Sequence, residues 1–404
     1  MFERHRPFIA EGEHVESDRH SRPVSAARIK ITTAAAYAVA GMVHLVTAAL
    51  FTVSLLLIVL GFRTVVQPLV GLMPLGLALA MRPRPGRLNP DLPTLRGADA
   101  PALFQLLNDI ADTGGVRRPD TVQFTPDFSI TVTHFGFRRK SCLLLGLPLW
   151  AAYPPQQRIA AVTHALAYTA PHNVRSRAFV ATALEALTAG SETMRANGNA
   201  YISWNANAYA WRADDVAAGA RRFNIRARTS EWVLWMPRAA MAATARLLLR
   251  LTLPALQSAQ LEADDATART ASSEAAVAAL NDQHLARAIC LEVHRLVIET
   301  KTLSRNRSAA TPHGDFWEIV AHHAERLREH RGSGRSSDPD ALTTAFDVTR
   351  DPFDALRMAR LTDTPQHRAT IVLNESSLTR IANELRLPEQ AVLSKMMRDG
   401  IAVT

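Results

Sequence analysis

The chain has 404 residues, of which 48% are hydrophobic and 21% charged, and its formal net charge is +9. This length allows one large domain, or two smaller ones with appendages, and the hydrophobic content is sufficient for a sizeable core. The basic residues are scattered and only 6% of residues are aromatic, which argues against nucleic acid as a partner and fits a surface beside anionic lipid.

The N-terminal third contains a predicted membrane segment. Residues 1–30 are polar and form the predicted tail, and no residue from Ile31 to Phe62 is charged. A bilayer-spanning helix needs roughly 20 residues, so this stretch is long enough to cross. Residues 64–81 are again uncharged but contain two prolines. The sequence therefore predicts a transmembrane helical hairpin over 31–82, with the lipid bilayer as a partner.

Charges around the hairpin predict its orientation. Basic residues flank both outer ends, at Arg28 and Lys30 and again from Arg82 onward. The positive-inside rule then places the tail and the main domain in the cytoplasm. If the proline-interrupted second segment only lies in the membrane interface, the main domain would be on the opposite side.

A second apolar segment, 231–256, carries three arginines. Each would cost at least about 2.5 kcal/mol at bilayer depth. We therefore predict an amphipathic helix that packs on the domain or lies on the membrane surface.

The main domain is predicted over 97–330, followed by a flexible linker at 331–340 and a region of short helices at 341–404. The pattern of apolar residues and turn residues predicts a mainly helical α+β domain with a small mixed sheet. The expected strands are 122–124, 130–133 and 142–145, and the expected helices are 101–112, 156–170, 174–222, 257–270 and 274–303. Cys142 and Cys290 lie in apolar surroundings and are predicted to be buried reduced thiols.

The most informative short segment is 154–173. In a His-Glu-x-x-His helix, two histidines four residues apart bind zinc from one face and the glutamate is the general base. Here His164 is present, but Ala165 stands at the position of the base and Tyr168 at that of the second ligand. This spacing alone is not specific, so its interpretation depends on the surrounding strings.

The surrounding strings are Gly115–Val122, Thr125–Ile130, Leu143–Leu149, Glu262–Asp264, Glu274–Leu280 and Asp347–Leu361. They resemble the HtpX-like and CAAX-prenyl-protease-like family of membrane zinc metallopeptidases. The order of parts is also similar: a membrane hairpin, a short helix, a small sheet, a metal helix and a second metal helix. The resemblance covers roughly residues 31–361 and implies a zincin-type, metallopeptidase-like fold.

The resemblance also assigns positions in the site. His164 corresponds to the first zinc ligand, Ala165 to the catalytic glutamate, Tyr168 to the second ligand and Gln260 to the third, a glutamate in the family. Asn173 corresponds to a family aspartate. A catalytic zinc needs three protein ligands and an open position, and loss of a general base costs about 10²–10⁴ in rate. We therefore expect a catalytically inactive protein with no cofactor.

One alternative keeps an enzyme. Asp264 lies one helical turn after Gln260 and could approach His164, with His172 as a further ligand, which would give an active membrane zinc metalloendopeptidase with an altered ligand set. In the simpler interpretation, Asp264 is a supporting or helix-capping carboxylate and His172 a surface residue.

A third alternative is a structural role, in which the domain is a scaffold in an envelope complex. The favoured prediction is a membrane-anchored pseudopeptidase that binds a polypeptide partner or regulates an active paralogue. An extended peptide can add to an exposed strand edge. The predicted docking strand consists of Phe128, Ser129, Ile130, Thr131, Val132 and Thr133.

Overall fold

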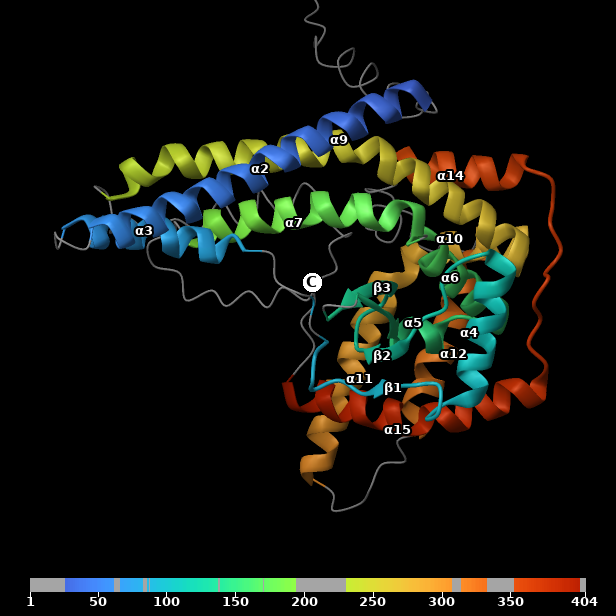
Figure 1. Cartoon of the computed structure of the whole chain (residues 1–404). Coiled ribbons are helices and arrows are strands. Elements are labelled where there is room, and N and C mark those ends of the chain that lie inside the picture. The colour runs from blue at the N-terminus through green and yellow to red at the C-terminus, as the bar shows by residue number, and fades with distance from the viewer. Residues whose placement is uncertain are drawn as a thin grey trace, which may run out of the picture. The chain divides into compact units, whose positions relative to one another are not determined.

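The described part of the chain contains helices and one four-stranded sheet, arranged in two compact units. One unit contains Arg87–Ala170 and Ala259–Thr404, and we call it the sheet unit. The other contains Val24–Gly86 and Pro171–Ser258, and we call it the helical unit. The computed structural model (Figure 1) describes residues 26–61, 66–82, 86, 88–136, 139–169, 171–193, 230–306, 314–332 and 352–399.

The helical unit is built from α2 (Ala26–Leu60), α3 (Val66–Ala80), α7 (Pro171–Thr193) and the first part of α9 (Ser230–Ala271). Helices α2 and α3 pack against each other, and α7 contacts both. Small side chains allow these helices to approach closely. The core of this unit contains Ala36, Ala40, Val43, Met81, Val180, Ala183, Ala186, Leu187 and Leu248.

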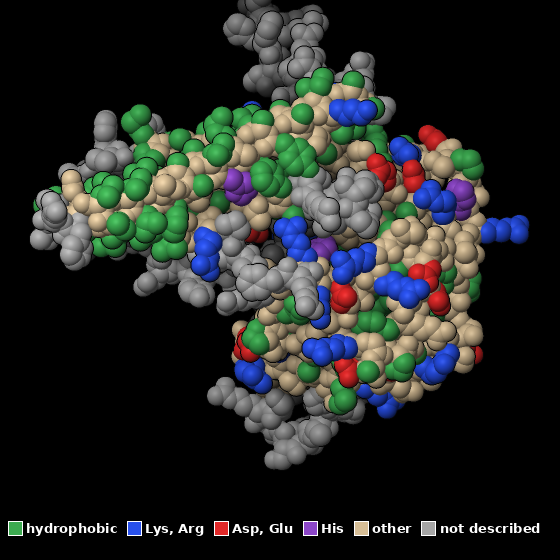
Figure 2. Space-filling model, viewed as in Figure 1, with side chains coloured by type: hydrophobic (Ala, Val, Ile, Leu, Met, Phe, Trp, Pro, Cys, Tyr) green, Lys and Arg blue, Asp and Glu red, His purple; other side chains and the backbone are tan. Residues whose placement is uncertain are grey.

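The outer surface of α2 and α3 is apolar. Leu45 and Leu60 on α2 are 71% and 75% exposed, and Figure 2 shows hydrophobic side chains over these helices. Two helices, Ala26–Leu60 and Met236–Ala271, are long and apolar enough to cross a membrane. Large apolar side chains exposed on a surface favour contact with an apolar medium over contact with water. The helical unit is therefore suited to association with a membrane.

Prolines interrupt these helices less than the sequence predicts. The apolar segment 64–81 is helical from Val66 to Ala80, with Pro74 inside the helix. Helix α9 is continuous where we expected two helices, at 231–256 and 257–270. A proline removes one backbone hydrogen bond and kinks a helix, but packing against neighbours can maintain the helix.

The sheet of the other unit is mixed, in the order β1-β2-β4-β3. Strand β1 (Thr94–Leu95) pairs antiparallel with β2 (Thr121–Thr125), which runs parallel to β4 (Lys140–Gly146). Strand β3 (Ile130–Phe135) pairs antiparallel with β4 and ends the sheet. The three predicted strands are confirmed, and so is the coarse α+β class, mostly helical with a small mixed sheet.

The chain enters β3 close to the end of β4. The amide of Gly146 donates to the carbonyl of Ser129 at 2.9 Å. A Cβ at position 146 would overlap the carbonyl oxygens of Asp127 and Ser129, so glycine is required where these two backbones meet.

Helices surround this sheet. In sequence order, these helices are α4 (Pro101–Gly114), α5 (Leu147–Ala152), α6 (Pro155–Tyr168), α10 (Ser273–Asp282), α11 (Ala286–Asn306), α12 (Gly314–Gly332), α14 (Pro352–Asp363) and α15 (Glu375–Asp399). The core joins apolar residues of α4, α6, α11, α12 and α15 to the sheet. Helix α15 runs beside α4, α11 and β2.

Several boundaries differ from the sequence prediction. The expected helix 274–303 is divided by the 3₁₀ turn Gln283–Leu285, and the expected short helices after residue 341 include the long α15. Cys142 is buried and Cys290 half-buried, and both are free thiols. Residues 1–25 of the predicted tail and 333–340 of the predicted linker lie outside the described residues.

Candidate functional site

His164 lies on α6, whose other face builds the core. Ile159, Ala160 and Val162 are fully buried on this helix, and the side chain of His164 is 27% exposed. The imidazole therefore lies at the boundary between core and solvent. Its ring is parallel to that of Tyr168, one turn later, with centroids 6.2 Å apart.

The structure brings Asp264 of α9 to this histidine. Its Oδ1 lies 3.3 Å from His164 Nε2, and the aspartate side chain is only 6% exposed. The proximity that the sequence suggested for these two residues is therefore present.

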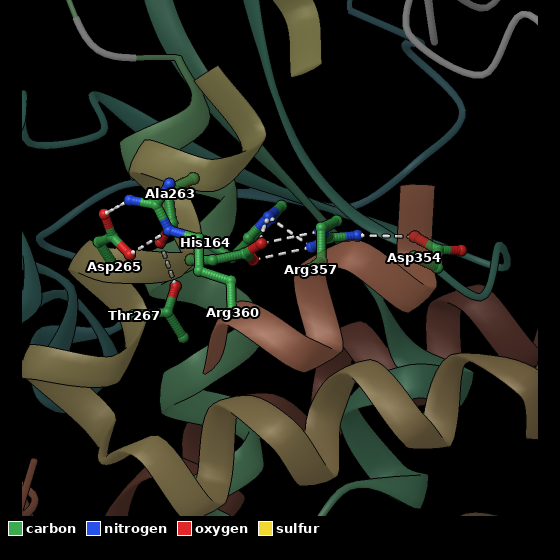
Figure 3. Close-up of polar contacts among 8 residues, drawn as sticks. His164, Ala263, Asp265, Thr267, Asp354, Arg357 and Arg360 are labelled. Carbon is green, nitrogen blue, oxygen red and sulfur yellow. Dashed lines mark hydrogen bonds and ion pairs between the residues drawn. The ribbon is translucent and has the colours of Figure 1, made fainter. Parts of the chain in front are cut away.

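A third side chain, Arg357 of α14, completes the cluster (Figure 3). Its Nε donates to Asp264 Oδ2 at 2.7 Å and its Nη2 to Asp264 Oδ1 at 2.8 Å. The same Nη2 lies 3.1 Å from His164 Nε2, and Nη1 donates to Asp354 Oδ1 at 3.1 Å. The guanidinium is 5% exposed and forms the bidentate pairing with a carboxylate that its planar geometry favours.

The charges in this cluster compensate one another. Burial raises the pKa of Asp264, but the hydrogen bonds from Arg357 and the close approach of His164 outweigh burial and lower that pKa to about 2. Burial lowers the pKa of Arg357, but the partners Asp264 and Asp354 outweigh this and raise it. The buried aspartate and arginine are thus both charged at neutral pH.

A second ion pair joins the same two helices. Arg360 Nη2 donates to Asp265 Oδ2 at 2.7 Å and its Nε to Oδ1 at 3.3 Å. Arg357 and Arg360 are three residues apart on α14, so both face the adjacent aspartates of α9. This outer pair is much more exposed, at 45% for Arg360 and 28% for Asp265.

As arranged, these side chains do not fit a zinc ion. Zinc needs lone pairs from three protein ligands, whereas the guanidinium of Arg357 has only donors and engages Asp264 and His164 Nε2. Within the described ranges, no three side chains of His, Cys, Asp or Glu gather as ligands.

The other predicted site residues lie apart from this ion-pair cluster. Ala165 is 6% exposed and packs in the hydrophobic core. Gln260 is half-buried, one turn before Asp264 on α9, and takes no part in the cluster among the described residues. The side chains of His172 and Asn173 are outside the described set, so the ligand role of His172 stays a prediction.

The predicted docking strand overlaps the terminal strand of the sheet. Ile130 to Thr133 belong to β3, whereas Phe128 and Ser129 precede it. Phe128 packs edge-on against Tyr153 with centroids 6.0 Å apart, and Val132 is 7% exposed. The side chains of Phe128 and Val132 therefore contribute to the packing of the sheet unit.

Backbone register defines which groups of β3 face outward. Gly146 donates to Ser129, so the hydrogen-bonded pairs with β4 continue at Thr131 and Thr133. In an antiparallel ladder the alternate residues point their N–H and C=O groups the other way. On β3 these are Ile130, Val132 and His134.

Arg357 is the site residue that sequence reasoning missed. It lies in the string Asp347–Leu361, which the sequence analysis used only for the family resemblance. A usable signal was present: Asp264 and Asp265 are adjacent, and Arg357 and Arg360 have helical spacing. Such matched pairs predict two ion pairs between helices.

Comparison with known proteins gives no match: no protein-family model, curated protein or solved structure is similar to the chain.

Proposed function

We propose that this protein is a membrane-anchored, catalytically inactive protein with a metallopeptidase-like, zincin-type scaffold, and that it binds a polypeptide partner. The loss of catalysis is supported by Ala165 at the base position and by Arg357, which engages both His164 and Asp264. A methyl group cannot accept a proton from water, and a guanidinium cannot deliver a metal-bound hydroxide.

The observation that carries the binding role is the position of β3 at the end of the sheet in the described part of the chain. Ile130, Val132 and His134 direct their backbone polar groups away from β4, by the register given above. An extended segment can pair with such groups, gaining affinity from main-chain hydrogen bonds. The partner is therefore a polypeptide in extended conformation, and an active paralogue with a free terminal segment is one candidate.

The same proposal places the protein in a membrane with its sheet unit in the cytoplasm. The apolar helices support the membrane location, and the basic residues on both sides of 31–82 favour the cytoplasmic side. Labelling of engineered cysteines in intact cells and in opened cells distinguishes the two sides.

The test of the binding role uses full-length protein in detergent micelles as bait for membrane polypeptides, with crosslinking before isolation. His134→Pro removes an outward N–H from β3, and His134→Ala removes the same side chain but keeps that N–H. We expect the proline variant to capture roughly tenfold less of each specific partner, since one backbone hydrogen bond of about 1 kcal/mol is lost and the proline ring obstructs strand pairing beside it.

The alanine variant should capture as much as wild type. Equal capture by His134→Pro, with its unfolding temperature unchanged, would show that partners do not pair with β3. Chelator-sensitive cleavage of an unfolded membrane protein by wild type would instead favour the enzyme with an altered ligand set.

A further inference from the structure

We propose that Arg357 is the resident cation of the His164–Asp264 centre, and that the space its guanidinium fills binds a free planar guanidinium ion when that side chain is removed. The cation that joins α6, α9 and α14 would then be part of the chain and not a metal ion. This inference concerns the internal centre of the sheet unit and does not depend on the polypeptide-binding role proposed for β3.

The contacts around the guanidinium match its shape. Its donors reach both oxygens of Asp264, the Nε2 atom of His164 and, on the opposite side, Asp354 Oδ1. Three partners at fixed directions select a planar ion with several N–H groups over a spherical one. A lysine ammonium has only three donors around one nitrogen and cannot span the same partners.

Burial and charge also favour a cation at this position. Asp264 is 6% exposed and cannot remain charged without a compensating partner. His164 is 27% exposed, so a small solute can reach the centre from solvent. Removal of the arginine side chain would leave a buried anion, a histidine nitrogen and a space of the size of the missing group.

Chemical rescue tests this proposal. The full chain carrying Arg357→Ala is purified in detergent, and its unfolding temperature is measured with and without about 10 mM guanidinium chloride. We expect a decrease on the order of 10 °C relative to wild type, and recovery of at least half of it on addition of guanidinium. Urea at the same concentration has the same planar shape without the charge and should give no recovery, and sodium chloride should give none.

Arg360→Ala is the matched control, because it removes the same charge from the same helix at an exposed ion pair. Its unfolding temperature should decrease by less than about 2 °C and should not respond to guanidinium. Arg357→Lys, which keeps the charge, should be less stable than wild type and provides the comparison if Arg357→Ala does not accumulate.

Metal analysis is a second test of the proposal. Wild type incubated with zinc and then gel-filtered should retain much less than one zinc per chain, and a chelator should leave its unfolding temperature unchanged. One zinc per chain that is lost in His164→Ala would overturn the proposal. It would also be overturned if Arg357→Ala and Arg357→Lys were as stable as wild type, or if guanidinium restored no stability to Arg357→Ala.

Discussion

Two arginines three residues apart on α14 occupy very different environments. Arg357 and Asp264 are 5% and 6% exposed, whereas Arg360 and Asp265 are 45% and 28% exposed. Water and salt screen the outer pair, and such pairs contribute about 0–1 kcal/mol. The inner pair is desolvated, so removal of either partner leaves an uncompensated buried charge.

Asp264→Asn is therefore expected to lower the free energy of unfolding by about 3–5 kcal/mol, because Arg357 loses its main counter-charge. Asp265→Asn removes the neighbouring charge and should cost less than about 1 kcal/mol. Denaturant unfolding of the two variants measures the difference. Similar losses in both would show that burial of the inner pair has no energetic consequence.

Elsewhere in the sheet unit, the half-buried side chains of Arg158 and Glu389 interact electrostatically. Arg158 donates from Nε to the carbonyl of Tyr153 at 2.8 Å, and its guanidinium lies 5.1 Å from the centroid of the Trp150 ring. Burial raises the pKa of Glu389 on α15 to about 7, although the charges of Arg158 and Arg386 oppose this rise. Burial likewise lowers the pKa of Arg158 to about 10.

The raised pKa of Glu389 predicts a pH dependence of stability. A carboxyl with a folded-state pKa near 7 and an ordinary unfolded value binds more protons when folded, so stability decreases as pH rises from about 4.5 to 7. We expect Glu389→Gln, which cannot ionise, to be relatively more stable at pH 8 than at pH 5 when compared with wild type. Unfolding temperatures at both pH values measure this, and a difference that is constant with pH would contradict the assignment.

At the scale of the element, one helix is capped by another. Helix α4 begins after Ala100, which offers no side-chain cap. Glu384 of α15 supplies it instead, because its two carboxylate oxygens accept from the amides of Ala102 and Leu103 at 2.8 and 2.9 Å. A negative charge at a helix N-terminus also interacts favourably with the helix dipole.

Glu384→Ala should accordingly lower the free energy of unfolding by about 1–2 kcal/mol, because two N–H groups and the charge interaction are lost. Asn383 is the exposed neighbour on the same helix, and Asn383→Ala should change stability by less than about 0.5 kcal/mol. Hydrogen exchange at Ala102 and Leu103 should accelerate only in the Glu384 variant. Unchanged protection there would argue against this cap.

At the scale of the whole molecule, the two units differ in surface chemistry. The outer faces of α2 and α3 in the helical unit are apolar, whereas the surface of the sheet unit carries ion pairs. An apolar surface of this length is stable in lipid and unfavourable in water.

We expect the full chain to stay with membranes after alkaline extraction and to be released by detergent. Val46 is 50% exposed in the middle of α2, and Val46→Arg should increase the extractable share, since an arginine at bilayer depth costs about 2.5–3.5 kcal/mol. Ile31, near the basic end of the helix, is the control, and Ile31→Arg should behave as wild type. Release of wild type by alkali alone would contradict membrane insertion.

Local patterns were sufficient for much of the fold. The three strands at 122–124, 130–133 and 142–145 were predicted from short apolar runs between turn residues, and α6 from its helical period. The uncharged length of Ile31 to Phe62 predicted a long apolar helix. The continuity of α9 through Pro254 was not predicted, because a local rule for proline does not include the packing that maintains the helix.

The sequence by itself determined that Ala165 follows His164 and that Tyr168 and Gln260 stand where the proposed resemblance would require zinc ligands. Only the tertiary structure showed that Arg357 contacts both His164 and Asp264, because Arg357 is separated from them by long stretches of chain and meets them only when the fold brings α14 and α9 together. The side chain at each position can be read from the sequence, whereas the partner of a buried charge depends on which helices the fold brings together.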